Sequence, residues 1–128
     1  MDTQDKRRRT RINIDLGVLV EQNDISRALK TQNMSLKGLL AQYHPEVVAG
    51  LPCSVTILLS SGIKIHIQGI VVTSQPDHGT SIDFIQIDES SFYHLFNLIR
   101  FYAKDPDQIK REILNPAFDE SRLELIKK

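Results

Sequence analysis

The segment VTILLSSGIKIHI, residues 55–67, decides the fold class. It contains two runs rich in β-branched residues, 55–59 and 63–67, on either side of Ser60-Ser61-Gly62. A short polar turn that contains glycine between two such runs is typical of a β-hairpin. The middle of the chain is therefore predicted to be antiparallel β-structure.

Further strands are predicted on the N-terminal side of this hairpin. Apolar and polar residues alternate over 12–20, which predicts one long amphipathic strand. Residues 23–24, Asn-Asp, predict a turn, and a weaker strand follows over 25–29. The polar segment 31–35 then predicts a second turn before extended structure over 36–43.

On the C-terminal side, Gly69 interrupts the second strand of the hairpin before residues 70–72 and predicts a bulge there. A turn at 76–79 leads to a last strand over 82–87. Asp88 is a suitable N-cap, and apolar residues recur at helical spacing over 92–102. Strands followed by terminal helices predict a mainly β fold, either a small antiparallel barrel or a sandwich, closed at one end by the helix.

The chain ends in a predicted C-terminal helical extension, residues 104–128. Asp105-Pro106 offers an N-cap and a first-turn proline for a second short helix. The helix before it is apolar on more than one side, which leaves two interpretations open. Either the second helix packs on the remaining apolar surface, or that surface forms a homodimer or binds a partner protein.

Composition is that of one globular domain. The chain has 128 residues, of which 41% are apolar and 25% charged, and its apolar runs are far too short to span a bilayer. Its single cysteine, Cys53, cannot form an internal disulfide, and no signal-like segment opens the chain. We therefore expect a cytoplasmic protein with no membrane insertion.

Charge is unevenly distributed although the formal net charge is zero. The basic N-terminal arm, residues 1–11, holds five basic groups against two acidic ones, whereas the rest of the chain holds 11 basic and 14 acidic residues. The body of the fold is thus not expected to attract nucleic acid or anionic membranes. Anion binding is expected at the arm.

The pattern of reactive residues argues against an enzyme or a metal site. The histidines and the cysteine lack zinc-like spacing, and no nucleophile elbow, P-loop or dinucleotide fingerprint is present. Asp83 alternates with Ile82 and Phe84, so we expect an exposed or hydrogen-bonded strand carboxylate there rather than a general base. Cys53 is expected to be a small buried residue.

Two short motifs carry the recognition chemistry. Arg7 and Arg11 form an RxxxR spacing ahead of the first strand, and Asn33, Ser35 and Gly38 form an NxSxxG spacing. Arginine can bind phosphate bidentately, pair with the O6/N7 edge of guanine or stack on a purine. Asparagine can bind a base edge, serine can serve a phosphate or base, and glycine fits where a Cβ would clash. Together they suit a nucleotide with two phosphates and guanine bases.

These motifs, in this order along the strand pattern, resemble the PilZ domain family, a bacterial receptor module for the second messenger cyclic di-GMP. The resemblance covers roughly residues 6–103. It implies a six-stranded antiparallel barrel with a C-terminal helix, here a barrel with its capping helix over 12–103. It also implies that Arg7 and Arg11 contact guanine and phosphate, while Asn33 and Ser35 hold the other side of the ligand.

Three further residues complete the expected ligand site. Gly38 belongs to the second motif, and Arg8 offers an alternative register for the first. Lys6 occupies a position that, in the family, is thought to influence whether one ligand or an intercalated pair is bound, and a long cation there favours the pair. No metal and no cofactor other than this ligand are expected.

The leading hypothesis is a non-enzymatic cyclic di-GMP receptor in which the ligand closes the arginine arm onto the barrel and alters a surface for a downstream protein supplied in trans. The alternative is a degenerate PilZ-like adaptor that binds proteins through its helices and binds no nucleotide. A third hypothesis, single-stranded nucleic-acid binding, needs stacking aromatics that the strands almost entirely lack. No nucleic-acid partner is therefore expected.

Overall fold

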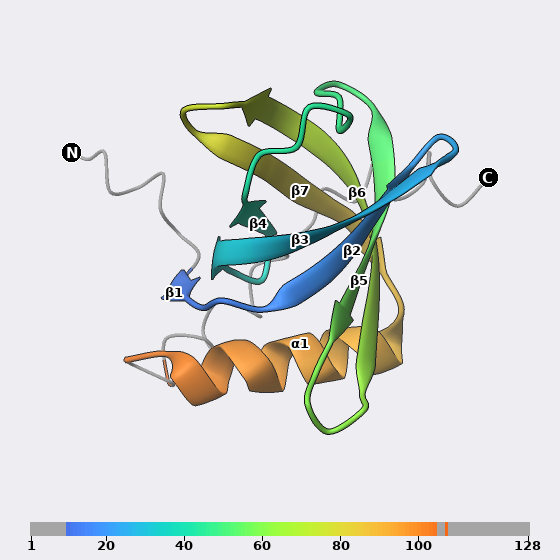
Figure 1. The fold of residues 1–128 in the computed structure, drawn as a ribbon. Coiled ribbons are helices and arrows are strands. Elements are labelled where there is room, and N and C mark those ends of the chain that lie inside the picture. Colours follow the sequence, from blue (N-terminus) through green and yellow to red (C-terminus); the bar gives the residue numbers. More distant parts are fainter. Residues whose placement is uncertain (1–9, 105–106, 108–128) are drawn as a thin grey trace.

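The computed structural model describes residues 10–104 and 107, which form a β-barrel with a helix beneath it (Figure 1). The barrel strands and the helix follow one another along the chain, with all strands before the helix. Their bounds are β1 Ile12–Asn13, β2 Gly17–Gln22, β3 Ile25–Met34, β4 Gly38–Ala41, β5 Pro52–Leu58, β6 Lys64–Gln75, β7 Gly79–Ile87 and α1 Glu89–Tyr102.

Strands β2 to β7 close into a six-stranded antiparallel barrel. The strand order is β1-β3-β2-β5-β6-β7-β4, and a further pairing between β3 and β4 joins the two sides of the sheet. The short strand β1 pairs with the end of β3, where Asn13 lies opposite Asn33. The predicted mainly β fold and six-stranded barrel are therefore confirmed.

The core fills the barrel because every second residue of each strand points inward. In β5, for example, Cys53, Val55 and Ile57 are buried. Leu95 and Ile99 of α1 belong to the same buried cluster, so the helix covers one end of the barrel with its apolar side (Figure 1).

The predicted continuous strand over 12–20 is wrong. The structure breaks it between β1 and β2, and the hydroxyl of Thr31 occupies the break: it donates to the Ile14 carbonyl and accepts from the Leu16 N–H at 2.9 Å. A buried side chain therefore replaces part of the strand ladder, and Asp15 projects to solvent. The alternation of apolar and polar residues does not predict this break between β1 and β2.

The predicted turn over 31–35 is also wrong in part. Strand β3 continues to Met34, so Asn33 lies on a strand rather than in the turn. Thr31 and Met34 are both buried, which keeps this polar segment attached to the barrel wall. The extended structure predicted over 36–43 shrinks to β4.

A bulge occurs at the level of Gly69, as predicted, but β6 is not interrupted there and the extra residue belongs to its partner β7. The β6–β7 register shifts between Gln68 and Gly69, because Gln68 pairs with Gln86 whereas Gly69 pairs with Phe84. Ile85 is thus the extra residue on β7, and it is buried. The shift bends the wall of the barrel at this point.

The helix begins as predicted after Asp88, whose carboxylate accepts a hydrogen bond from the Ser91 N–H at 2.7 Å. This hydrogen bond lowers the pKa of Asp88 below its usual value. The other side of the helix carries Tyr93, Phe101 and Tyr102, which are 62%, 80% and 52% exposed. The second helix predicted after Asp105 falls, apart from Asp107, outside the described residues, so both interpretations of this apolar surface stay open.

Among residues 10–104 and 107, no helix is both long enough and apolar enough to cross a bilayer.

Candidate functional site

The centre of the candidate site is the tight turn between β3 and β4, which contains Ser35. The Ser35 N–H donates to the Gly38 carbonyl at 2.8 Å, which closes the turn. The Ser35 hydroxyl accepts from the N–H groups of Lys37 at 3.1 Å and Gly38 at 3.2 Å. Ser35 is 1% exposed, so its hydroxyl shapes the turn from inside. Its expected contact with a ligand stays a prediction.

The same turn is fixed against β7. Gly38 pairs with Asp83, and a Cβ on Gly38 would lie 2.5 Å from the Ile82 carbonyl oxygen. Glycine is needed here because β4 and β7 approach more closely than any side chain allows. The Phe84 N–H also donates to the Lys37 carbonyl at 2.7 Å. The predicted reason for Gly38, a clash of a Cβ, is therefore confirmed with the backbone of β7 as the neighbour.

Arg11, from the other motif, contacts the end of β3 just before this turn. Its guanidinium donates to the side-chain oxygen of Asn33 at 2.7 Å. The pairing of β1 with β3 places the two residues together, because Asn13 lies opposite Asn33. Arg11 is exposed and Asn33 half-buried, so the rest of the arginine fork faces solvent. The structure thus brings together one residue from each predicted motif.

The remaining candidates of the first motif are Lys6, Arg7 and Arg8. All three lie outside the described residues, so their expected ligand contacts stay predictions.

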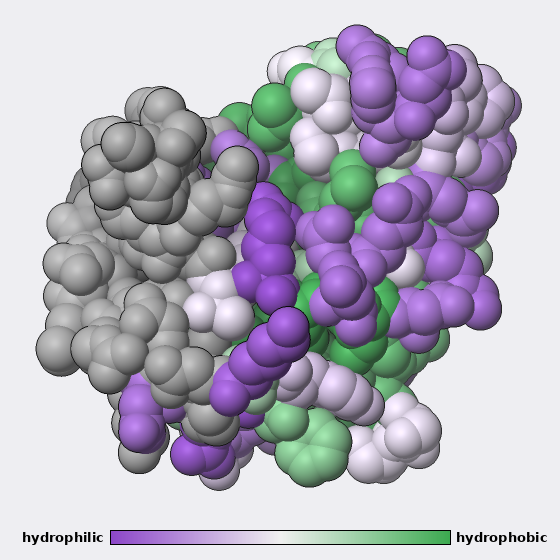
Figure 2. Space-filling view, turned by 90° about the vertical axis from the view of Figure 1, so that its left-hand side faces the viewer, coloured by the Kyte–Doolittle hydropathy of each residue, from purple (hydrophilic) through white to green (hydrophobic). Residues whose placement is uncertain are grey.

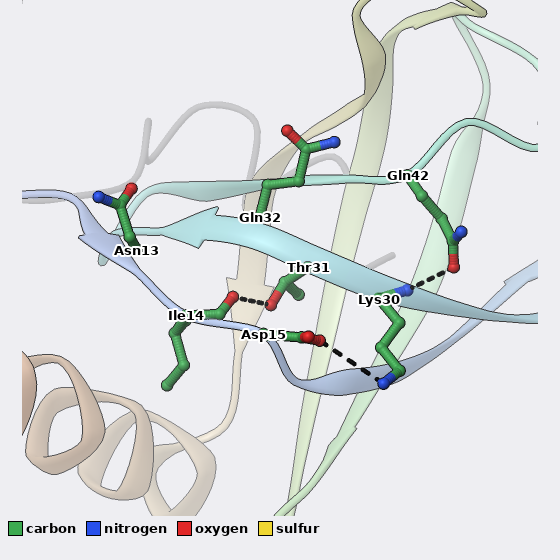
Figure 3. A pocket seen from close by; sticks show the side chains of 7 residues that line it. All are labelled: Asn13, Ile14, Asp15, Lys30, Thr31, Gln32 and Gln42. Atoms are coloured by element: carbon green, nitrogen blue, oxygen red, sulfur yellow. Dashed lines mark hydrogen bonds and ion pairs between the residues drawn. The ribbon is translucent and has the colours of Figure 1, made fainter.

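An open pocket of about 380 Å³ adjoins this site along β1 and β3 (Figure 3). Lys30 pairs with Asp15 at 3.7 Å, and the Lys30 N–H donates to the Gln42 side chain at 2.9 Å. The pocket is lined by Asn13, Ile14, Asp15, Lys30, Thr31, Gln32 and Gln42. The face that includes this edge of the barrel is largely hydrophilic where its residues are described (Figure 2). The sequence analysis did not single out this pocket. Lys30 and Gln32, which lie on the outer face of β3, were the available signal.

The other reactive groups fit structural roles. Burial raises the pKa of the Cys53 thiol to about 12, and the predicted small buried cysteine is confirmed. His66 is exposed on the polar side of β6, as predicted, with its ring nitrogen 3.3 Å from the Thr56 hydroxyl. Within the described part of the chain, no cluster of three metal-ligating residues occurs.

Comparisons with known proteins agree with this fold. The family model described as PilZ domain matches residues 5–101. The PilZ domain of YcgR from Escherichia coli, solved with c-di-GMP, is similar to this chain with a TM-score of 0.61 and 14% identity, covering 87% of this chain and 98% of that one. A search of curated proteins finds no match.

Two further solved structures share the fold. The PilZ domain of CeSA from a cellulose-synthesizing bacterium has a TM-score of 0.58 and 14% identity, covering 70% of this chain and 93% of that one. The Bacillus subtilis inhibitor of motility MotI/DgrA has a TM-score of 0.60 and 14% identity, covering 84% of this chain and 52% of that one.

Proposed function

This chain belongs to the PilZ domain family, and we propose that it is a non-enzymatic receptor for cyclic di-GMP. The observation that carries the proposal is the hydrogen bond from Arg11 to Asn33, since it joins the RxxxR segment to the first residue of the NxSxxG motif at one edge of the barrel. A ligand held by both motifs requires this juxtaposition. The similar YcgR domain, solved with c-di-GMP, supports the choice of ligand.

The chemistry of the site suits a dianionic ring with two guanines. Arg11 uses one of its N–H groups on Asn33 and retains the others for phosphate or for the O6/N7 edge of guanine. Asn33 is a neutral amide, so it orients the guanidinium without cancelling its positive charge. The N-terminal arm carries a net positive charge, which favours an anionic ligand at this edge.

Ligand binding is proposed to act as the signal by closing the arm. Arg11 anchors the end of the arm at Asn33, and the ligand recruits Arg7 and Arg8 from the rest of it. The closed arm then changes the surface offered to a downstream protein supplied in trans. The size of that population shift is limited by the difference in ligand affinity between the open and closed arms.

Calorimetric titration with cyclic di-GMP tests this function directly. The full chain is expected to bind at micromolar affinity or tighter, and Arg7→Ala and Arg11→Ala to weaken binding at least tenfold, as expected for loss of a charge-assisted pair. Arg27→Ala is the matched control, because Arg27 pairs with Glu46 near the opposite end of β3. A full chain that shows no binding rejects the receptor function.

The exposed aromatic side chains of α1 favour a second candidate, a protein-binding adaptor. Phe101 is 80% exposed, and its ring packs edge-on against Tyr102 with centroids 5.0 Å apart. Sedimentation velocity of the full chain and of Phe101→Asp, with and without cyclic di-GMP, separates the candidates. Self-association that Phe101→Asp abolishes and the dinucleotide leaves unchanged favours the adaptor, with a homodimer as the assembly.

A further inference from the structure

Thr31 lies at a change of register between β3 and the first two strands. Gly17 pairs with Lys30, whereas Asn13 pairs with Asn33. The chain takes four steps from Gly17 to Asn13 but only three from Lys30 to Asn33, so one extra residue lies opposite Thr31. This is a β-bulge, and it shifts the pairing of β1 along β3 by one residue.

The Thr31 hydroxyl replaces the hydrogen bonds that this bulge removes. It donates to the Ile14 carbonyl, as Figure 3 shows, and accepts from the Leu16 N–H at 2.9 Å. The Thr31 N–H also donates to the Leu16 carbonyl at 2.9 Å. Without the hydroxyl, two half-buried backbone groups would lose their partner, which is unfavourable. The hydroxyl therefore stabilises the shifted register.

The alternation of β3 changes at the same place. Leu29 and Thr31 are buried, but the next buried side chain on β3 is Met34 rather than Asn33. On the β4 side, the register likewise shifts between Thr31 and Asn33. Uninterrupted alternation from Thr31 would direct Asn33 into the barrel. The shift leaves Asn33 half-buried instead, where its side-chain oxygen accepts from Arg11.

Arg11 depends on the same register. Without the bulge, regular pairing would set Ile14 rather than Asn13 opposite Asn33. Arg11 would then lie one residue farther along β3, a displacement of about 3.4 Å in an antiparallel strand. The hydrogen bond from Arg11 to Asn33 is 2.7 Å long, so this displacement takes the guanidinium, in its present rotamer, out of hydrogen-bonding range.

From this geometry we infer that Thr31 is a positioning residue: its hydroxyl fixes the register that brings Arg11 and Asn33 together, and thereby sets the affinity of the site for its ligand. Thr31 is buried and acts through these two side chains. Its effect on affinity rests on the proposed receptor function, whereas its effect on the contact between Arg11 and Asn33 requires no ligand.

Thr31→Val tests the hydroxyl, because valine keeps the β-branched shape and removes only the hydrogen bonds. Calorimetric titration with cyclic di-GMP is expected to show binding weakened at least about fivefold in Thr31→Val and retained in Thr31→Ser, which keeps the hydroxyl. Thr80→Val is the matched control. Thr80 is 0% exposed in the same barrel, and its hydroxyl has no hydrogen-bond partner among the described residues, so no change in affinity is expected.

A measurement without ligand separates positioning from a general loss of stability. The side-chain amide resonances of Asn33 are compared by NMR in the wild type, Arg11→Ala, Thr31→Val and the double variant. Each single substitution is expected to shift these resonances, and Arg11→Ala is expected to add nothing once the Thr31 hydroxyl is removed. A general loss of stability would leave the effect of Arg11→Ala on the folded protein unchanged.

The outcomes separate this inference from the function. A wild-type chain that binds no cyclic di-GMP rejects the receptor function, while the Asn33 resonances still decide whether Thr31 positions the contact. Unchanged affinity in Thr31→Val, or an equal effect of Arg11→Ala with and without the Thr31 hydroxyl, overturns the inference alone. If Thr31→Val does not fold, folded Thr31→Ser decides: weakened binding there overturns the inference, and wild-type binding with unchanged Asn33 resonances supports it.

Discussion

The guanidinium of Arg11 donates a hydrogen bond to the side-chain oxygen of Asn33 at 2.7 Å, across 22 positions of the chain. The contact holds the end of the N-terminal arm against the last residues of β3. A carboxylate at position 33 would form an ion pair with the arginine, whereas the amide leaves its charge available to an anion. The pair is therefore preorganised for a phosphate ligand.

Arg11 and Asn33 are expected to act as a unit in binding cyclic di-GMP. Arg11→Ala and Asn33→Ala should each weaken binding, and the double variant should lose less than the two losses added together, with a coupling of about 0.5 kcal/mol or more, because the residues are in contact. A double-mutant cycle by calorimetry measures this coupling. Additive losses would show that the two side chains contact the ligand independently.

Gly38→Ala is expected to destabilise the barrel by about 1–3 kcal/mol, because the new Cβ would meet the Ile82 carbonyl at 2.5 Å. Gly17→Ala provides the control, since nothing lies within 4 Å of a Cβ at that exposed position. Urea unfolding followed by circular dichroism gives both free energies of unfolding. Equal stability of the two variants would contradict the close approach of β4 to β7.

Ser35→Ala is expected to lower the free energy of unfolding by about 1–2 kcal/mol, because two backbone N–H groups in a buried turn lose their acceptor. Ser26→Ala removes an exposed hydroxyl from β3, the strand before this turn, and is expected to change little. Thermal unfolding of both variants makes the comparison. A neutral Ser35→Ala would mean that the turn holds its shape without the hydroxyl.

Asp88→Ala is expected to cost about 1 kcal/mol at neutral pH through loss of the helix N-cap. The Ser91 N–H lowers the pKa of Asp88 in the folded state, so the carboxylate stabilises the fold above its ordinary pKa. This contribution is lost as the pH falls through the lowered folded pKa. Unfolding of wild type and variant between pH 7 and pH 2 should therefore show the difference shrinking in acid, and a constant difference would reject the charged cap.

Alternation, turn residues and the helix N-cap predicted a mainly β fold and the start of α1, because these signals are local in sequence. These signals left a barrel and a sandwich both open, and the six-stranded barrel was predicted from the resemblance to the PilZ domain family. The break between β1 and β2 could not be predicted, since Thr31 causes it from another strand. The position of Asn33 on β3 was missed because polar residues occur both in turns and on the outer face of a barrel.

The candidate site, too, was predicted only where its signals are local in sequence. The two motifs predicted Arg11 and Asn33, which the structure brings together. The need for glycine at position 38 depends on the β4–β7 register, which places Gly38 opposite Asp83. That register is set by barrel closure and has no local signal. The inward role of the Ser35 hydroxyl likewise depends on the geometry of the closed turn.

The hydrogen bond from the Phe84 N–H to the Lys37 carbonyl has a consequence for engineering. A hexapeptide with the sequence of residues 33–38, synthesised alone or grafted into a foreign scaffold, would lack the strand that holds its backbone in place. A transplantable sensor module must therefore include β7 together with residues 33–38. Chimaeras that exchange residues 33–38 alone are expected to lose the conformation of this turn, even when every residue of the motif is retained.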